Sequence, residues 1–101
     1  MVKKTGSGNT RTPRSVTQLS HEDMRGRAAE KLLNDKTLNQ ALDDMREAAF
    51  VLIADSAMDQ KQEREDLYLF VKTIDKLKKQ LHVYINKGKG AGIQLKEVRN
   101  G

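Results

Sequence analysis

The stretch "LYLFVKTIDKLKKQLHVYI", residues 67–85, carries the strongest structural signal in the sequence. Its large apolar residues recur at steps of 3, 4, 3, 4 and 3 along the chain, starting from Leu67. That spacing places them on one side of an α-helix, whereas a half-buried β-strand would alternate apolar and polar residues. We therefore expect a helix over about residues 60–86.

A second stripe with similar spacing precedes the first and predicts a helix over about residues 36–56, with Asn34 or Asp35 as its N-cap. The stretch between the two helices, "DSAMDQKQ", has the polar composition of a turn. Two heptad-like stripes joined by a short turn predict an antiparallel helical hairpin. Its core seam would consist of Leu38, Leu42, Met45, Leu52, Leu67, Phe70, Ile74, Leu77 and Leu81.

A shorter helix is expected before the hairpin, over about residues 21–33. In "SHED", Ser20 is a favourable N-cap and two acids follow in the first turn. The apolar residues Met24, Ala28 and Leu32 would pack this helix across the open side of the hairpin. The predicted fold is therefore all-α, with a three-helix domain over residues 20–87.

The glycine-rich stretch "NKGKGAG", residues 86–92, suggests either a phosphate-binding loop or the end of a helix. Nucleotide-binding glycine loops follow a strand and open a helix, but this stretch follows a predicted helix. We therefore expect the helix to end here, with Gly88 at the C′ position and Lys87 and Lys89 near the negative end of the helix dipole. Residues 88–101 would form a glycine-rich basic tail that could add one or two helical turns.

Charge is divided unevenly along the chain, whose net charge is +5. Residues 1–20 carry 4 basic residues and no acid, residues 21–66 carry 7 basic and 12 acidic residues, and residues 67–101 carry 8 basic and 2 acidic residues. Since residues 1–19 contain few large apolar side chains, we expect a flexible basic arm there. The acidic middle could meet the basic ends of a second copy.

The basic residues also suggest contact with nucleic-acid phosphates or with another partner. Three lysines at positions i, i+4 and i+7 form a stripe on the last predicted helix. The candidate contact residues are Lys3, Lys4, Arg11, Arg14, Lys72, Lys76, Lys79, Lys87 and Lys89. Neither a short helix–turn–helix nor exposed aromatic residues interleaved with basic ones occur, so we do not expect sequence-specific reading.

Catalytic and metal-binding motifs are missing from the sequence. There is no cysteine, which excludes disulfides, thiol catalysis and thiolate metal sites. His21 and His82 belong to no ligand pair, and a thin helical domain offers the acidic residues little pocket. We expect no enzymatic activity, no metal and no cofactor. No apolar run is long enough to cross a membrane, and the first residues lack the apolar segment of a signal peptide.

The run from Arg64 to Leu95, "REDLYLFVKTIDKLKKQLHVYINKGKGAGIQL", resembles a segment of small helical proteins encoded by tailed bacteriophages, and the likeness extends over about residues 30–95. Those proteins often carry Trp and Thr in their middle helix, where this chain has Phe50 and Ser56. The resemblance implies a phage origin and a role in the virion, in assembly or in contact with the host. It carries over no catalytic residue. The matched positions are Arg64, Glu65, Leu67, Tyr68, Asp75, Lys76, Leu77, Leu81, Ile85, Gly88 and Lys89.

These observations together favour a non-enzymatic, self-associating interaction protein that serves a phage particle or its assembly. Its expected partners are further copies of itself or another phage protein, in the host cytoplasm or the virion. One alternative is a nucleic-acid-associated protein that uses the basic arm and the lysine stripe. Another is a small phage inhibitor of a host protein, whose acidic middle would imitate nucleic acid.

Overall fold

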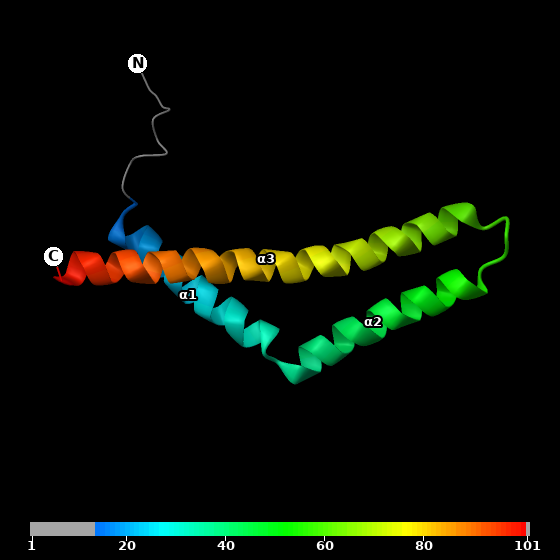
Figure 1. The fold of residues 1–101 in the computed structure, drawn as a ribbon, viewed down its shortest axis with the longest axis horizontal. Helices are drawn as coiled ribbons and strands as arrows, with labels where there is room; N and C mark the ends of the chain where they lie inside the picture. The colour runs from blue at the N-terminus through cyan, green and yellow to red at the C-terminus, as the bar shows by residue number, and fades with distance from the viewer. Residues whose placement is uncertain (1–13, 101) are drawn as a thin grey trace, which may run out of the picture.

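The computed structural model describes residues 14–100, and this part of the chain forms three α-helices and no strand. Helix α1 spans Val16–Leu33, α2 spans Lys36–Asp55 and α3 spans Lys61–Asn100. The predictions of an all-α fold and of a helical hairpin are confirmed, since α2 and α3 run antiparallel on either side of a short turn (Figure 1). The predicted flexible arm falls largely on residues 1–13, which lie outside the described residues.

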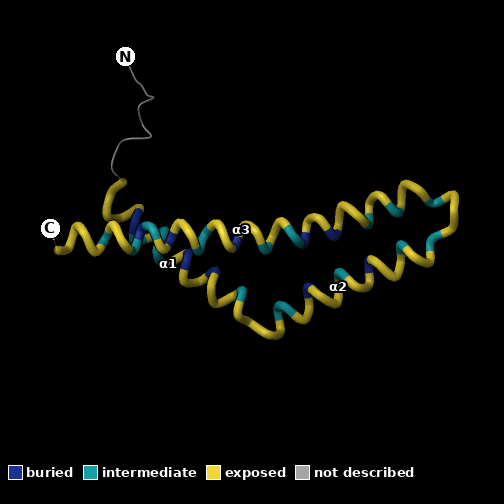
Figure 2. The backbone as a smooth tube through the Cα atoms, viewed as in Figure 1, coloured by how far each residue is buried: buried dark blue, intermediate teal, exposed yellow. Residues whose placement is uncertain are grey.

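The three helices form the sides of a flat triangle (Figure 1). The molecule extends 63 Å along its longest axis but only 13 Å along its shortest. The Cα atoms of one helix occupy a cylinder about 4.6 Å wide, and packed helix axes lie about 8–10 Å apart. A thickness of 13 Å therefore holds two crossing helices and no further layer. Buried residues are accordingly few, and they lie where helices face or cross one another (Figure 2).

Helix α1 begins earlier than predicted, with Ser15 rather than Ser20 as its N-cap. The Ser15 hydroxyl accepts a hydrogen bond from the Gln18 backbone N–H at 3.1 Å, and the Gln18 side chain accepts one from the Ser15 N–H at 3.2 Å. This reciprocal pair satisfies two N–H groups that a helix start otherwise leaves free. Residues 16–19, expected to belong to the flexible arm, are therefore helical, and Leu19 is buried.

Helix α1 also packs elsewhere than predicted, because it crosses the C-terminal half of α3 and leaves the hairpin open (Figure 1). Its buried residues are Leu19, Gly26 and Ala29. The predicted apolar face of Met24, Ala28 and Leu32 is exposed instead. The small residues Gly26 and Ala29 allow a close approach to α3 that larger side chains would prevent, so the small-residue side of α1 makes the contact.

The prediction that the last helix ends near residue 86 is wrong, since α3 continues through the glycine stretch to Asn100. Gly88 is a buried residue in the middle of the helix, and no glycine of residues 14–100 has a positive φ angle. Glycine lowers helix propensity by about 1 kcal/mol relative to alanine. Here the absent side chain lets α1 approach the α3 backbone, and this tertiary contact outweighs the propensity. The predicted basic tail over residues 88–101 is therefore helical as far as residue 100.

Candidate interaction surface

The predicted core seam is only partly buried between α2 and α3. Leu42, Ile74 and Leu81 are buried, and Leu38 and Leu67 are half-buried. The rest of the predicted seam is 40–57% exposed, which corrects the prediction for Met45, Leu52, Phe70 and Leu77. A single pair of helices buries only the sides that face each other, so stripes wider than this contact leave part of their apolar surface in solvent.

The four exposed seam residues share one positional relation to the core. Each follows a buried or half-buried residue by three positions, as Met45 follows Leu42 and Leu77 follows Ile74. Three residues turn about 300° around a helix, so all four are displaced in the same rotational sense from the contact line. In an antiparallel pair, equal rotations on the two helices lead to the same face. Met45, Leu52, Phe70 and Leu77 therefore form one apolar face of the hairpin, called here the open face.

Small residues extend the open face along α2. Ala41 precedes Met45 by four residues and Ala48 follows it by three, so both lie on the same side of the helix. Both alanines are exposed. Flanking alanines leave room for another helix to approach the larger side chains closely, and the open face thus has the composition of a helix-packing surface.

The same side of α3 is covered farther along the helix, by α1. Continuing the seven-residue spacing from Phe70 and Leu77 leads to Tyr84, which is half-buried, and to Ala91, which is completely buried. Arg25 of α1 lies over the Tyr84 ring, with its guanidinium carbon 4.3 Å from the ring centre. One continuous stripe of α3 is therefore covered by a helix in its C-terminal half and uncovered in the hairpin.

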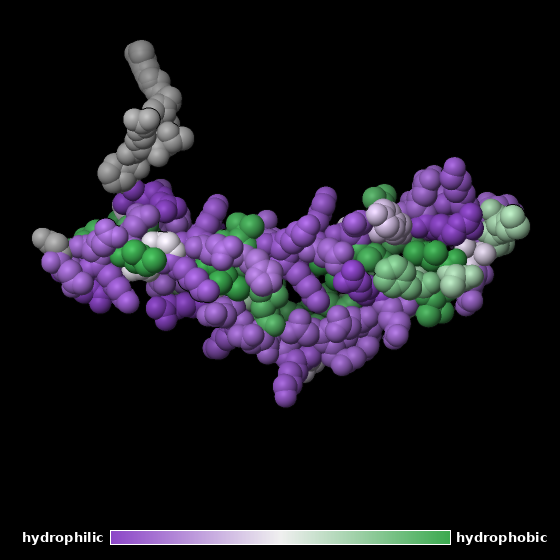
Figure 3. Space-filling view, in the orientation of Figure 1, coloured by the Kyte–Doolittle hydropathy of each residue, from purple (hydrophilic) through white to green (hydrophobic). Residues whose placement is uncertain are grey.

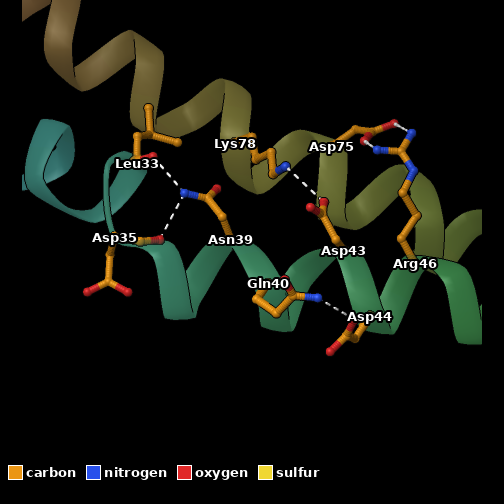
Figure 4. Close-up of polar contacts among 9 residues, drawn as sticks. All are labelled: Leu33, Asp35, Asn39, Gln40, Asp43, Asp44, Arg46, Asp75 and Lys78. Carbon is orange, nitrogen blue, oxygen red and sulfur yellow. Dashed lines mark hydrogen bonds and ion pairs between the residues drawn. The ribbon is translucent and has the colours of Figure 1, made fainter.

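The opposite face of the hairpin is polar and held by ion pairs (Figure 4). The Arg46 guanidinium lies 2.9 Å from the Asp75 carboxylate, and Lys78 Nζ lies 3.7 Å from Asp43. Arg46 and Lys78 each follow a buried residue by four positions, which displaces them in the sense opposite to the open face. Charged pairs thus join α2 to α3 along one edge of their contact, while the other edge is apolar.

Further apolar side chains are exposed near the end of the hairpin. Phe50 is 49% exposed and Tyr68 is 53% exposed, and Lys72 Nζ lies 5.4 Å from the centre of the Tyr68 ring. Figure 3 shows hydrophobic side chains gathered between hydrophilic ones where α2 and α3 meet at the turn. The hairpin therefore exposes apolar side chains near its turn in addition to those of the open face.

The predicted basic residues do not form one continuous surface. Lys72, Lys76 and Lys79 are exposed and line a shallow depression on α3 together with Asp75 and Lys78. Lys87 and Lys89 are also exposed, farther along the helix. Arg14 is held by Glu22 at 2.7 Å, which partly neutralises its charge. Lys3, Lys4 and Arg11 lie outside the described residues.

Within residues 14–100, no three acidic or histidine side chains are grouped so that they could hold a metal ion. None of the three helices has an apolar stretch long enough to cross a membrane. Comparison with protein families, with characterised proteins and with solved structures finds no match to this chain.

Proposed function

We propose that this protein is a non-enzymatic interaction protein that self-associates by pairing the open face of one hairpin with the open face of another. The observation that carries the proposal is the uncovered row of Met45, Leu52, Phe70 and Leu77 on a hairpin only one helix thick. Two such hairpins stacked face to face make a four-helix bundle, in which every apolar stripe is covered from two directions. The contact is the same on both copies, as a two-fold dimer requires.

The coverage of α3 by α1 supports this choice of partner. Within one chain, the stripe that contains Phe70 and Leu77 continues into a segment that is already packed by a helix. The uncovered half offers the same heptad spacing, which fits another helix rather than an extended peptide or a small molecule. A second copy supplies two helices with matching spacing.

The test is sedimentation velocity of the full chain over a range of protein concentrations, comparing the wild type with Leu77→Glu and Met45→Glu. The wild type is expected to form the face-to-face dimer, and each variant to lose this dimer, because a charge buried at the centre of an apolar contact is strongly unfavourable. Val51→Glu is the matched control, since Val51 is 53% exposed and lies nine residues after Leu42, on the opposite side of α2. Circular dichroism checks that each variant remains helical.

Two results would refute the proposal. One is a wild-type chain that remains monomeric at the highest concentration, and the other is a control variant that dissociates as readily as Leu77→Glu.

The resemblance to small helical phage proteins suggests where such a self-associating protein acts. We propose a role in a phage virion or its assembly, for which an all-helical, self-pairing chain is suited. Mass spectrometry of purified particles would test a virion role directly: a structural component is expected in reproducible copy number, and its consistent absence would leave only a role outside the finished particle.

A second candidate function is binding to nucleic-acid phosphates through Lys72, Lys76 and Lys79. The observation in its favour is that all three ammonium groups are exposed around one depression of α3. Filter binding to duplex DNA at rising salt would test it, since phosphate contacts predict an affinity that falls steeply with salt concentration. Neutralising the three lysines together to glutamine should abolish this binding, and unchanged affinity would exclude the stripe as the contact.

A further inference from the structure

A second interaction surface lies at the tip of the hairpin, in the turn between α2 and α3. The turn holds Met58 almost entirely in solvent, with 96% of the residue exposed. This is the greatest exposure of any large apolar residue in the described part of the chain. Isolated apolar side chains are common on protein surfaces. Met58 differs from these because hydrogen bonds hold the backbone of its turn in one conformation.

The turn is fixed by the Arg64 guanidinium, which donates hydrogen bonds to three of its acceptors. These are the Ala57 carbonyl at 2.6 Å, the Ser56 hydroxyl at 3.0 Å and the Met58 carbonyl at 3.2 Å. The Gln60 side chain also accepts a bond from the Ala57 N–H at 2.8 Å. A contact segment that is already ordered loses little backbone entropy when it binds, which favours association. The tip is therefore prepared to insert Met58 into a complementary surface.

The sequence on either side of Met58 is acidic. Residues 55–66 contain five acids and only two basic residues, Lys61 and Arg64. The guanidinium of Arg64 donates its hydrogen bonds into the turn. Lys61 is the basic residue of this segment for which no such bond to the turn is found. The acids are Asp55, Asp59, Glu63, Glu65 and Asp66. A partner surface for the tip should accordingly combine an apolar floor with a basic rim.

Such a surface lies toward the other end of the molecule, in a cleft between α1 and α3. Its lining includes Ile85, Gly92 and Ile93. A Cβ added at Gly92 would make an ordinary contact with one Asp23 carboxylate oxygen, 3.4 Å away, whereas one at Gly88 would lie 2.9 Å from the α1 backbone. The cleft is therefore accessible at Gly92 and covered by α1 at Gly88. Four basic residues and two acids line the cleft, and one of the acids, Asp23, is already paired with Arg27 at 3.3 Å. The basic lining residues are Arg27, Lys89, Lys96 and Arg99.

We propose that the hairpin tip of one copy docks into this cleft of the next, with Met58 against Gly92 and Ile93 and the acids of the tip against Lys89 and Lys96. The tip and the cleft lie toward opposite ends of the long axis (Figure 1). The contact therefore joins two different surfaces, and repeating it produces an open head-to-tail chain rather than a closed dimer. The open face takes no part in this contact, so the two forms of association are independent. Together they would link dimers into larger assemblies.

The test separates the two contacts by using Leu77→Glu as the parent, because this variant disables the open face. The parent is expected to grow head-to-tail with concentration in sedimentation velocity. Adding Met58→Ser to the parent removes the inserted side chain, and adding Lys89→Glu with Lys96→Glu reverses the charge of the cleft. Each of these two variants alone is expected to be monomeric. Mixed together, they should form a one-to-one complex and nothing larger, because only one intact tip and one intact cleft remain.

Circular dichroism and thermal unfolding confirm that each variant is folded before mixing. A parent that remains monomeric at all concentrations would overturn the head-to-tail proposal while leaving pairing of the open faces intact. A Met58→Ser variant that grows like the parent would overturn it as well, and so would a mixture that remains monomeric.

Discussion

At the scale of single residues, the crossing of α1 and α3 depends on two glycines. A Cβ atom on Gly26 would lie 2.8 Å from the Tyr84 carbonyl oxygen and 2.9 Å from the Gly88 Cα atom. A Cβ on Gly88 would lie 2.9 Å from the Glu22 carbonyl oxygen and from the Gly26 Cα atom. All four distances are shorter than real Cβ atoms adopt, and the obstructing groups are backbone. The helices must separate if either glycine acquires a side chain.

We therefore predict that Gly88→Ala lowers the free energy of unfolding by about 1–3 kcal/mol, the usual range for overpacking. Urea unfolding followed by circular dichroism would measure it. Gly90→Ala is the control, since a Cβ there would meet nothing within 4 Å. This second variant should stabilise the chain by about 0.5–1 kcal/mol, because alanine is the better helix former. Equal effects from the two variants would contradict the close crossing.

The same glycines show why the end of α3 could not be predicted from the sequence. The stretch "NKGKGAG" has low helix propensity, which suits a helix end as well as a close helix crossing. The difference is made by Gly26, far away in the sequence, whose backbone meets Gly88 only after the chain has folded. A local sequence pattern contains no information about this contact. The pattern therefore predicts that α3 ends at the position where it packs against α1.

At the scale of the elements, the order of the hairpin turn depends on Arg64. We predict that Arg64→Met speeds amide hydrogen exchange in residues 57–60 and lowers the free energy of unfolding by about 1–2 kcal/mol, since charge-assisted hydrogen bonds to the turn are lost. Exchange in the middle of α2 should change much less. Lys61→Met removes the same charge from the same end of α3 and should leave exchange in the turn nearly unchanged. Equal protection of the turn in both variants would show that Arg64 does not hold it.

Helical periodicity predicted α2 and the start of α3 well. The limits of α2 follow from the spacing of apolar residues. Of the two predicted N-cap candidates, Asn34 and Asp35, the structure has Asp35, whose side chain accepts a hydrogen bond from the Leu38 N–H at 2.8 Å. Periodicity identifies a stripe but not the width that a neighbour covers. Leu42 and Met45 are equally part of the α2 stripe, yet only Leu42 is buried. The sequence pattern therefore predicts the residues of the open face as core and cannot show that they are exposed.

At the scale of the whole molecule, the two proposed contacts should respond differently to salt. We predict that raising the ionic strength from about 0.05 M to about 0.5 M shortens head-to-tail chains of the Leu77→Glu variant, because screening weakens the attraction between the acidic tip and the basic cleft. Dimers paired through the open face should persist, since apolar contacts are not screened. In the Met58→Ser variant, which retains only that contact, light scattering should give a nearly constant mass across the series. A mass that falls equally with salt in both variants would contradict this division.

The triangular arrangement has a mechanical consequence. Three stiff rods joined at their corners keep their angles without any filling between them, as in a roof truss, whereas two rods joined at one end can swing. Here the corners are the short link between α1 and α2, the hairpin turn and the glycine crossing of α1 on α3. A small core can therefore hold a frame 63 Å long, because the connectivity of its corners supplies the rigidity that thick proteins obtain from bulk packing. Loosening the glycine crossing would let the hairpin swing as one piece relative to α1.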